Sequence, residues 1–283
     1  MSFVDLHVHT TASDGSCSPT EVVRMARDLG LAAIAVTDHD TVSGCAEARL
    51  VGEALGLEVV PGIEISTRVD GTVVHILGYY PDLAAPGLTE ACAWMVRERD
   101  ERNRHIAERM AADGLPVSYE TMVRRFGVVI GRPHFAELLV ELGLASDVSD
   151  AFKRYLERGG PYFLPRRMLS LECSIRAIVE AGGVAVLAHP FQYRMDDKRL
   201  RALIEESMAH GLRGMECLYS GYSGEQSAYL SALAREYDLL RTGGSDFHGV
   251  PKPHIVLGRG TGDLAVPYAC LEALREAAGK KNE

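Results

Sequence analysis

The sequence predicts an α/β protein built as a distorted (β/α)7 barrel of mostly parallel strands, with a helical insertion domain. Three observations favour this fold. Short apolar runs alternate along the chain with segments whose apolar residues recur at helical spacing. A length of 283 residues suits a single α/β barrel of about 250 residues. Histidines and carboxylates recur where predicted strands end, which is where such folds place their active sites.

The first half of the chain begins with a strand and then alternates helix and strand. Residues 3–9 alternate in polarity, as a strand does. Ser18-Pro19-Thr20-Glu21 forms a capping box with Pro at the first helical position, and Gly30 closes the helix that follows. The other elements expected in this half are strands at 31–37, 57–66 and 73–79, a helix near 45–56, and a hairpin turn at 69–72.

The second half repeats this alternation after an interruption. Its expected elements are helices at 170–181, 197–210, 224–237 and 267–278, and strands at 184–189, 212–219 and 239–245. The interruption has a helical pattern throughout, with helices expected at 88–112, 131–143 and 149–158. We therefore expect residues 1–87 and 168–283 to form the metal-binding barrel, and residues 88–167 to form an insertion that covers the barrel mouth.

Composition and charge argue against several classes of protein. Hydrophobic residues make up 47% of the chain and charged residues 24%, which are ordinary values for a soluble globular protein. The apolar runs are too short to span a membrane, and the N-terminus enters a strand at once, leaving no room for a signal peptide. A net charge of −9 argues against a general polyanion-binding protein. The six cysteines are scattered without a CxxC pair, which indicates reduced thiols in a cytoplasmic protein.

Nine potential metal ligands are spread along the chain. His7 and His9 stand two apart in a strand, so both imidazoles point to one face and can grip one ion. A single histidine near a strand end is usually an ordinary residue, but here chance must repeat itself at nine positions. Imidazole with carboxylate favours zinc, manganese or iron over calcium or magnesium alone. The predicted ligands of a multinuclear metal hydrolase are His7, His9, Asp14, His39, Glu64, His75, His189, Asp246 and His248.

Other polar residues are candidates for catalysis or substrate contact. Asp40 is expected to orient the attacking water or a ligand imidazole. Arg132 and His134 stand on either side of a proline that makes the turn rigid. A guanidinium can hold phosphate in a bidentate fork, and His134 is a candidate proton donor to the leaving oxygen; the alternative for Arg132 is a helix cap. Arg166 is a weaker phosphate candidate, and Tyr222 either stacks on a base or packs at the rim.

Five motifs together resemble those of the PHP (polymerase and histidinol phosphatase) superfamily, and the resemblance covers nearly the whole chain. The motifs are Asp5-Leu6-His7-Val8-His9-Thr10 with Ser13-Asp14-Gly15, Thr37-Asp38-His39-Asp40, Gly62-Ile63-Glu64-Ile65-Ser66 with His75, His189-Pro190, and Ser245-Asp246-Phe247-His248. The insertion, with Gly131-Arg132-Pro133-His134, is similar to a branch of stand-alone members that act on nucleotides. That branch includes a 3′,5′-nucleoside bisphosphate phosphatase and a 5′→3′ exoribonuclease.

The resemblance implies a centre of three divalent ions, with manganese expected and iron or zinc as alternatives. The implied ligand sets are His7, His9, Glu64 and Asp246 for one ion, Asp14, His39 and His248 for a second, and Glu64, His75 and His189 for a third. Glu64 would then bridge two ions. Many members have His at the place of Asp14, so the second site here is more acidic. The resemblance therefore leaves the identity of the metal at this site open. A hydroxide that bridges two ions would attack phosphorus.

These residues support one leading hypothesis for the function and three alternatives. The leading hypothesis is a metal-dependent phosphatase that removes the 3′-phosphate of nucleoside 3′,5′-bisphosphates. The first alternative is a 5′→3′ exoribonuclease acting on short RNA. An amidohydrolase also begins with HxH, but Glu64 in place of a bridging lysine argues against it. A non-catalytic PHP module is disfavoured because all nine ligands are present. The expected partner is a small phosphorylated nucleotide or short RNA, and no membrane or protein partner is implied.

Overall fold

The computed structural model describes residues 2–126 and 130–280 and divides into two compact units. Unit 1 comprises Met1–Cys92 and Leu169–Glu283, and unit 2 comprises Ala93–Met168. The boundary falls inside one long helix, α3 (Pro86–Ala112). The expected placement of residues 88–167 over the barrel mouth stays a prediction.

Unit 1 contains an eight-stranded sheet in the order β7-β6-β5-β4-β3-β2-β1-β8. The pairs β1–β2, β2–β3, β5–β6 and β6–β7 are parallel, whereas β4 runs antiparallel to both of its neighbours. The predicted barrel-like sheet is confirmed, with one strand of two residues added. The strands are β1 (Phe3–Val8), β2 (Ala33–Val36), β3 (Glu58–Val69), β4 (Thr72–Tyr79), β5 (Val184–Leu187), β6 (Gly214–Tyr219), β7 (Leu240–Gly244) and β8 (Val266–Pro267).

The sheet is nearly closed where the end of β1 meets the segment that follows β7. Val8 forms a parallel bridge with Phe247, Asp246 N donates to His7 O at 2.8 Å, and His9 N donates to Phe247 O at 2.9 Å. Gly244 allows this approach, because a Cβ at this position would lie 2.4 Å from the backbone nitrogen of His7. Closure therefore brings the first and last predicted ligand motifs side by side.

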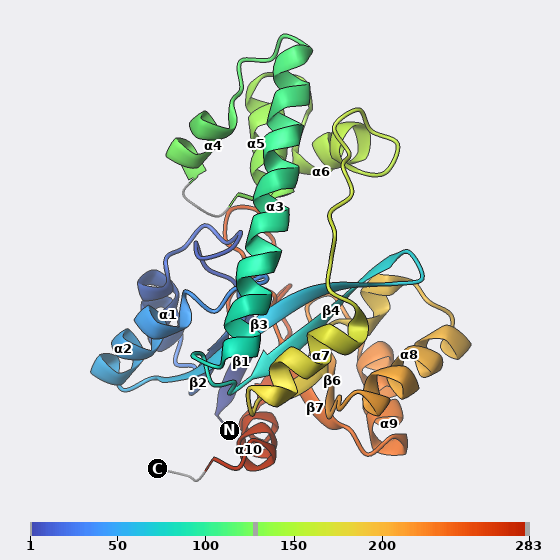
Figure 1. Cartoon of the computed structure of the whole chain (residues 1–283). Helices are drawn as coiled ribbons and strands as arrows, with labels where there is room; N and C mark the ends of the chain where they lie inside the picture. The colour runs from blue at the N-terminus through green and yellow to red at the C-terminus, as the bar shows by residue number, and fades with distance from the viewer. Residues whose placement is uncertain (1, 127–129, 281–283) are drawn as a thin grey trace. The chain divides into compact units, whose positions relative to one another are not determined.

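The helices of unit 1 lie outside the strands (Figure 1). Ser18 caps the first of them, and Glu21 completes the predicted capping box. The helix α10 packs on a core that includes Val4, Leu77 and Val186 from three strands. The helices are α1 (Pro19–Asp28), α2 (Cys45–Leu55), α7 (Leu171–Glu180), α8 (Asp197–Ala209), α9 (Gly224–Glu236) and α10 (Tyr268–Ala277), with a short 3₁₀ turn η2 (Pro190–Tyr193).

Unit 2 is helical and has its own core, which includes Ile106, Phe135 and Leu139. Beyond α3 it contains α4 (Tyr119–Phe126), α5 (Arg132–Glu141), α6 (Val148–Ala151) and a π-helical turn, η1 (Phe152–Leu156). Two expectations need correction. The helix α4 was not expected as a separate element, and the helix expected at 149–158 is α6 followed by η1. Glu157 N donates to Phe152 O at 2.8 Å, so the last turn is wider than an α-turn.

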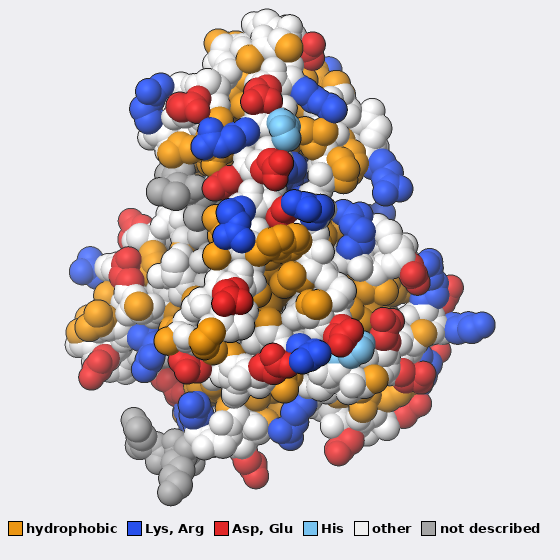
Figure 2. Space-filling model, viewed as in Figure 1, with side chains coloured by type: hydrophobic (Ala, Val, Ile, Leu, Met, Phe, Trp, Pro, Cys, Tyr) orange, Lys and Arg blue, Asp and Glu red, His pale blue; other side chains and the backbone are white. Residues whose placement is uncertain are grey.

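The surface carries charges of both signs. On the face drawn in Figure 2, acidic and basic side chains are interspersed over both units and do not gather into one patch of a single sign. Within residues 2–126 and 130–280, none of the helices is both long and apolar enough to cross a bilayer. Recognition of an anion would therefore depend on a local site and not on the overall charge.

Replacing Gly244 by Ala should destabilise unit 1. The new Cβ would collide with His7 on β1, so β1 and β7 would have to separate, and overpacking of this kind costs about 1–3 kcal/mol. Chemical denaturation followed by circular dichroism should show a lower midpoint. Gly224→Ala is the matched control, because a Cβ there meets nothing within 4 Å. Equal midpoints for the two variants would mean that the close approach at Gly244 does not matter.

Candidate metal centre

The nine predicted ligands converge on one site in unit 1. Most lie at or just beyond the carboxyl ends of β1, β2, β5 and β7, whereas Glu64 lies within β3 and His75 within β4. Two atoms that each lie about 2.1 Å from one ion are at most about 4.2 Å apart, which gives a test of each pair of ligand atoms. Four overlapping groups have ligand atoms that all lie within 4.8 Å of one another: His9, Asp14, His39 and His248; His7, His9 and Asp246; His7, Glu64 and His189; and His39, Glu64 and His75.

Glu64 lies at the middle of the site. Its Oε1 is 2.9 Å from His75 Nδ1 and 3.0 Å from His189 Nε2. Three more imidazole nitrogens face Oε2 at 3.0, 3.2 and 3.4 Å, those of His39, His9 and His7. Because both oxygens face imidazoles on different strands, the carboxylate has the position that a bridge between two ions requires.

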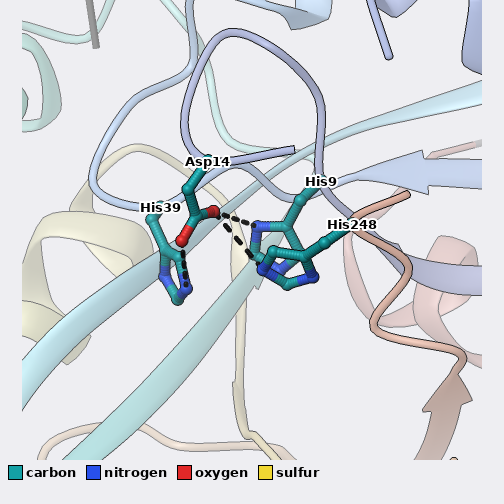
Figure 3. A group of neighbouring side chains, drawn as sticks. All are labelled: His9, Asp14, His39 and His248. Atoms are coloured by element: carbon teal, nitrogen blue, oxygen red, sulfur yellow. Dashed lines mark ion pairs between the residues drawn. The ribbon is translucent and has the colours of Figure 1, made fainter. Parts of the chain in front are cut away.

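Asp14 lies between histidines from three other segments (Figure 3). Its Oδ1 is 3.3 Å from His248 Nε2 and 3.8 Å from His9 Nδ1, and its Oδ2 is 4.0 Å from His39 Nε2. All these separations are within the limit for atoms that share an ion. The sequence resemblance implied Asp14, His39 and His248 as one set, and the structure adds His9 to it.

Asp246 is held by two donors on one oxygen. Tyr219 OH and Lys252 Nζ each donate to Oδ2 at 2.6 Å. The other oxygen, Oδ1, lies 3.2 Å from His9 Nε2 and 3.6 Å from His7 Nε2. The two donors therefore leave Oδ1 directed at the imidazoles. The sequence analysis assigned this role to neither Tyr219 nor Lys252.

The backbone is strained at three positions around the site. Asp40, His189 and Asp246 have φ angles of 60°, 23° and 57°, in the left-handed region that non-glycine residues seldom adopt. Such strain persists only where the surrounding structure fixes it, and it concentrates at functional sites. All three residues lie shortly after the end of a strand. The strained conformation therefore occurs where the chain turns from the strand into the following loop.

Three buried carboxylates outside the predicted ligand set connect the segments that carry the ligands. Asp5 accepts hydrogen bonds from Ser245 N and Gly258 N at 2.8 and 2.7 Å. Asp38 accepts from Thr10 N at 2.8 Å and Ser13 Oγ at 2.6 Å. Glu216, the third, contacts both His7 and His189. A sequence signal existed for Asp5 and Glu216, because each is the one acidic residue within its strand.

The pKa values of the ligands show how strongly the charges interact. Burial alone would raise the pKa of Glu64, but the imidazoles of His39 and His75 hold it well below its ordinary value. Burial would also lower the pKa of His7, yet Glu216, Glu64 and Asp246 together raise it well above its ordinary value. Burial lowers the pKa of His248 to about 4, helped by nearby His9 and Lys252. The site thus favours ionised carboxylates and needs positive charge near them.

The charge and the free donor atoms of the site fit bound cations. Seven carboxylates of unit 1 are buried, whereas no Lys or Arg among its described residues is; Lys252 is 37% exposed at its side chain. Buried polar atoms that lack a hydrogen-bond partner within the described part of the chain include His7 Nε2, both ring nitrogens of His9, Glu64 Oε2 and His189 Nδ1. Buried charges and donors left in this way are costly unless they bind an ion. The seven carboxylates are Asp5, Asp14, Asp38, Asp40, Glu64, Glu216 and Asp246.

The other predicted residues lie outside the four ligand groups. Asp40 accepts a hydrogen bond from Ser66 N at 2.8 Å, which braces β3 two residues beyond Glu64. Tyr222 OH accepts from Phe191 N at 3.0 Å. In unit 2, buried His134 accepts from Gly131 N at 2.9 Å through Nδ1, so it caps α5, a role that had not been assigned to it.

Two predicted phosphate contacts lie on arginines of unit 2. Arg132 is the first residue of α5, and its guanidinium donates to Leu156 O at 3.4 Å and lies 5.8 Å from the ring of Phe152. Arg166 belongs to the lining of a cavity of about 230 Å³ that also includes Arg102 and His105. Contacts of Arg132, His134 and Arg166 with a phosphate stay predictions.

Adding a divalent metal should stabilise the folded protein. An ion that binds only the native state adds about 2.7 kcal/mol when its concentration is about 100 times Kd. Thermal unfolding of protein stripped with a chelator should therefore start at a lower temperature than unfolding with Mn²⁺. Asp246→Asn should show a smaller shift, because one charged ligand is lost. A melting temperature that does not respond to Mn²⁺, Zn²⁺ or Fe²⁺ would contradict a metal centre here.

Comparison with known proteins supports the same interpretation. The model of the PHP domain matches residues 5–157. A 5′→3′ exoribonuclease of Escherichia coli, Rnm, is 39% identical over 258 residues, covering 90% of this chain and 88% of the relative. A 3′,5′-nucleoside bisphosphate phosphatase of Chromobacterium violaceum is 34% identical over 250 residues, covering 88% of each.

A solved structure is similar over the full length. A protein of Bifidobacterium adolescentis, provisionally described as a metal-dependent phosphoesterase, superposes with a TM-score of 0.86 at 32% identity, covering 99% of this chain and 97% of its own. The family match covers more than half of the chain, and both curated relatives exceed 30% identity over most of their length. The predicted family is thereby confirmed: this chain is a member of the PHP family.

Proposed function

We propose that this protein is a metal-dependent phosphoesterase that removes the 3′-phosphate from nucleoside 3′,5′-bisphosphates. The observation that carries the proposal is the position of Glu64, whose two oxygens face five imidazole nitrogens between 2.9 and 3.4 Å away. A carboxylate surrounded in this way suits a multinuclear centre, and multinuclear centres suit phosphoryl transfer to water. The similarity to the bisphosphate phosphatase of Chromobacterium violaceum supports the choice of substrate.

We assign three divalent ions to the centre. Three such ions together with Lys252 would carry as much positive charge as the seven buried carboxylates carry negative charge. The residues assigned to them are His7, His9, Glu64 and Asp246 for one ion, Asp14, His39 and His248 for a second, and Glu64, His75 and His189 for a third. Manganese, iron and zinc all accept this mixture of imidazole and carboxylate, and manganese is the ion we expect.

Bound ions would acidify a water molecule and neutralise charge on the phosphoryl oxygens. The chain itself supplies the geometry. Asp246 presents one oxygen because Tyr219 and Lys252 hold the other. Asp40 steadies β3 next to Glu64 through Ser66. Because the side chains of His7, His9 and Glu64 are at most 1% exposed, bulk water has little access to these three residues, which strengthens the charge interactions among them.

A second candidate is a 5′→3′ exoribonuclease, and the 39% identity to Rnm favours it. The two reactions break the same bond. In the bisphosphate, water displaces the 3′-oxygen of a 5′-phosphorylated nucleotide from a terminal phosphate. In RNA with a 5′-phosphate, water displaces the equivalent 3′-oxygen from the phosphate that joins the first nucleotide to the second. The substrates therefore differ in what else is attached to phosphorus, and both carry a 5′-phosphate that must be held without being cleaved.

We assign the 5′-phosphate to Arg132, with His134 and Arg166 as further contacts, and the base to Tyr222. Arg132 begins α5, where its guanidinium adds to the positive end of a helix dipole. Tyr222 supports the base assignment through its surroundings. Its ring contacts Phe191 edge to face at 5.4 Å, and Phe191 follows the ligand His189 by two residues, so an aromatic surface adjoins the metal centre.

Glu64→Ala should remove more than one metal ion per chain. A bridging carboxylate serves two sites, so its loss weakens both. Elemental analysis of the purified proteins should give close to three ions per chain for wild type. The metal content of Glu64→Ala should be lower by more than one ion per chain. Asp14→Ala is the matched control and should lose about one ion, because Asp14 is assigned to only one of the three ions. A single ion in wild type that persists in Glu64→Ala would contradict the trinuclear assignment.

Wild-type protein with Mn²⁺ should release phosphate from adenosine 3′,5′-bisphosphate much faster than from AMP. The reason is that AMP lacks the 3′-phosphate, and its 5′-phosphate is assigned to Arg132 and not to the ions. A parallel assay on a 5′-phosphorylated oligoribonucleotide measures the second candidate function. Glu64→Ala serves as the control for contaminating phosphatases. Shortening of the oligonucleotide without turnover of the bisphosphate would favour the exoribonuclease, and equal hydrolysis of AMP and bisphosphate would contradict both substrate assignments.

A further inference from the structure

Glu216 is a buried charge that the proposed metal sets do not use. It lies within β6, its side chain is fully buried, and it is in none of the four groups of potential ligands. A carboxylate inside an apolar strand is costly unless its oxygens are occupied. Both oxygens of Glu216 are occupied, and each contacts a residue that we assign as a metal ligand.

The first oxygen faces a side chain. Glu216 Oε1 lies 3.0 Å from Nδ1 of His7. A carboxylate offers acceptors only, so Nδ1 carries the proton and donates it. The other nitrogen, Nε2, then points to Glu64 and Asp246, at 3.4 and 3.6 Å. The contact thus selects the nitrogen of His7 that is available to an ion and stops rotation of the ring.

The second oxygen faces a backbone. Glu216 Oε2 accepts a hydrogen bond from His189 N at 2.8 Å. This residue has φ 23° and ψ 62°, a strained conformation that needs support from its neighbours. The conformation brings His189 Nε2 to 3.0 Å from Glu64 Oε1. The rings of His7 and His189 stack at 5.7 Å with an angle of 17° between them. One carboxylate therefore fixes the positions of two neighbouring imidazoles.

We propose that Glu216 is a positioning residue that fixes His7 and His189 in one arrangement and thereby links the ion assigned to His7 with the ion assigned to His189. The inference rests on the proposed metal centre. Its consequence is that removing one charge, which touches no ion, should weaken the binding of two ions that have different histidine ligands. A residue that merely filled space would affect stability without this selective loss.

Glu216→Gln is the diagnostic variant. An amide has nearly the same shape, but it offers one acceptor group where the carboxylate offers two. If its oxygen stays with His189 N, its NH₂ must face His7 Nδ1, which then has to accept. The proton of a neutral His7 would move to Nε2, the nitrogen that should bind the ion. Either His7 takes the tautomer that protonates its ion-facing Nε2, or the amide turns round and His189 N loses its acceptor.

The experiment compares metal binding by wild type, Glu216→Gln and Thr242→Val after removal of metal with a chelator. Thr242 is fully buried and pairs directly with Glu216 on the neighbouring strand β7, so its replacement controls for disturbance of the sheet. Titration with Mn²⁺ by calorimetry, with metal content by elemental analysis, should show affinity reduced about 10- to 100-fold in Glu216→Gln and unchanged in Thr242→Val. Two of the three ions should be affected.

Unfolding of the metal-free proteins separates positioning from folding. Metal-free Glu216→Gln should unfold at a temperature close to that of metal-free wild type, and the difference should appear only with Mn²⁺. If Glu216→Gln does not fold, Glu216→Asp tests the same idea, because it keeps both acceptors but withdraws them by one methylene, and it should also bind Mn²⁺ more weakly.

The outcomes distinguish this inference from the proposed function. Wild-type protein that binds no divalent ion would overturn the metal centre and this inference with it. Wild-type protein that binds ions, with Glu216→Gln binding them equally well, would overturn the positioning role alone. An equal loss of affinity in Thr242→Val would also overturn it, since any change in the sheet would then suffice.

Discussion

The burial of seven carboxylates in one unit is the constraint on which the rest of this structure depends. Taking a carboxylate out of water costs several kcal/mol or more unless hydrogen bonds or cations replace the water. Different groups in the fold offset this cost for different carboxylates. Asp5 and Asp38 are surrounded by backbone and hydroxyl donors, Asp246 has Lys252 and Tyr219, and Glu64 has imidazoles on both oxygens.

Two of these carboxylates, Asp5 and Asp38, also hold the barrel together at the end that carries the candidate ligands. Asp5 joins β1 to the segment after β7, and Asp38 joins the loop after β2 to the loop after β1. Each of these bonds connects two segments that carry candidate ligands. The same groups that create the electrostatic demand therefore also give the ligand-bearing loops their fixed positions, so at Asp5 and Asp38 stability and ligand geometry depend on the same hydrogen bonds.

Local sequence patterns were sufficient for the strands, most helices and the nine residues that cluster as candidate ligands. These features are visible in the sequence because each depends on a few neighbouring residues: a period of two or 3.6, a capping box, a histidine at the end of an apolar run. Glu216 and Lys252 were not found, since their importance depends on which distant segments become neighbours. The contact of Glu216 with His7 joins residues 209 positions apart, and no local pattern encodes that pairing.

The same limit explains the smaller errors. The two-residue strand β8 exists only because it pairs with β1, and two residues have no periodicity to detect. The turn η1 departs from the expected helix by one hydrogen-bond step, which propensity does not distinguish. Where unit 2 sits with respect to the barrel depends on tertiary contacts of the whole chain, so the sequence could suggest a cover for the mouth but not establish one.

The closure between β1 and the segment after β7 has a consequence for how the protein is made. Asp5 and Ser245, which meet at this seam, are 240 residues apart. During synthesis β1 emerges first and β7 near the end, so β1 must wait with one edge unpaired while unit 2 and the five strands β2 to β6 are added. Contacts of such long range form slowly, and an open edge is prone to wrong pairing. Because Asp246 and His248 arrive with the last segment, an unfinished chain lacks two of the nine candidate ligands until synthesis of the barrel is almost complete.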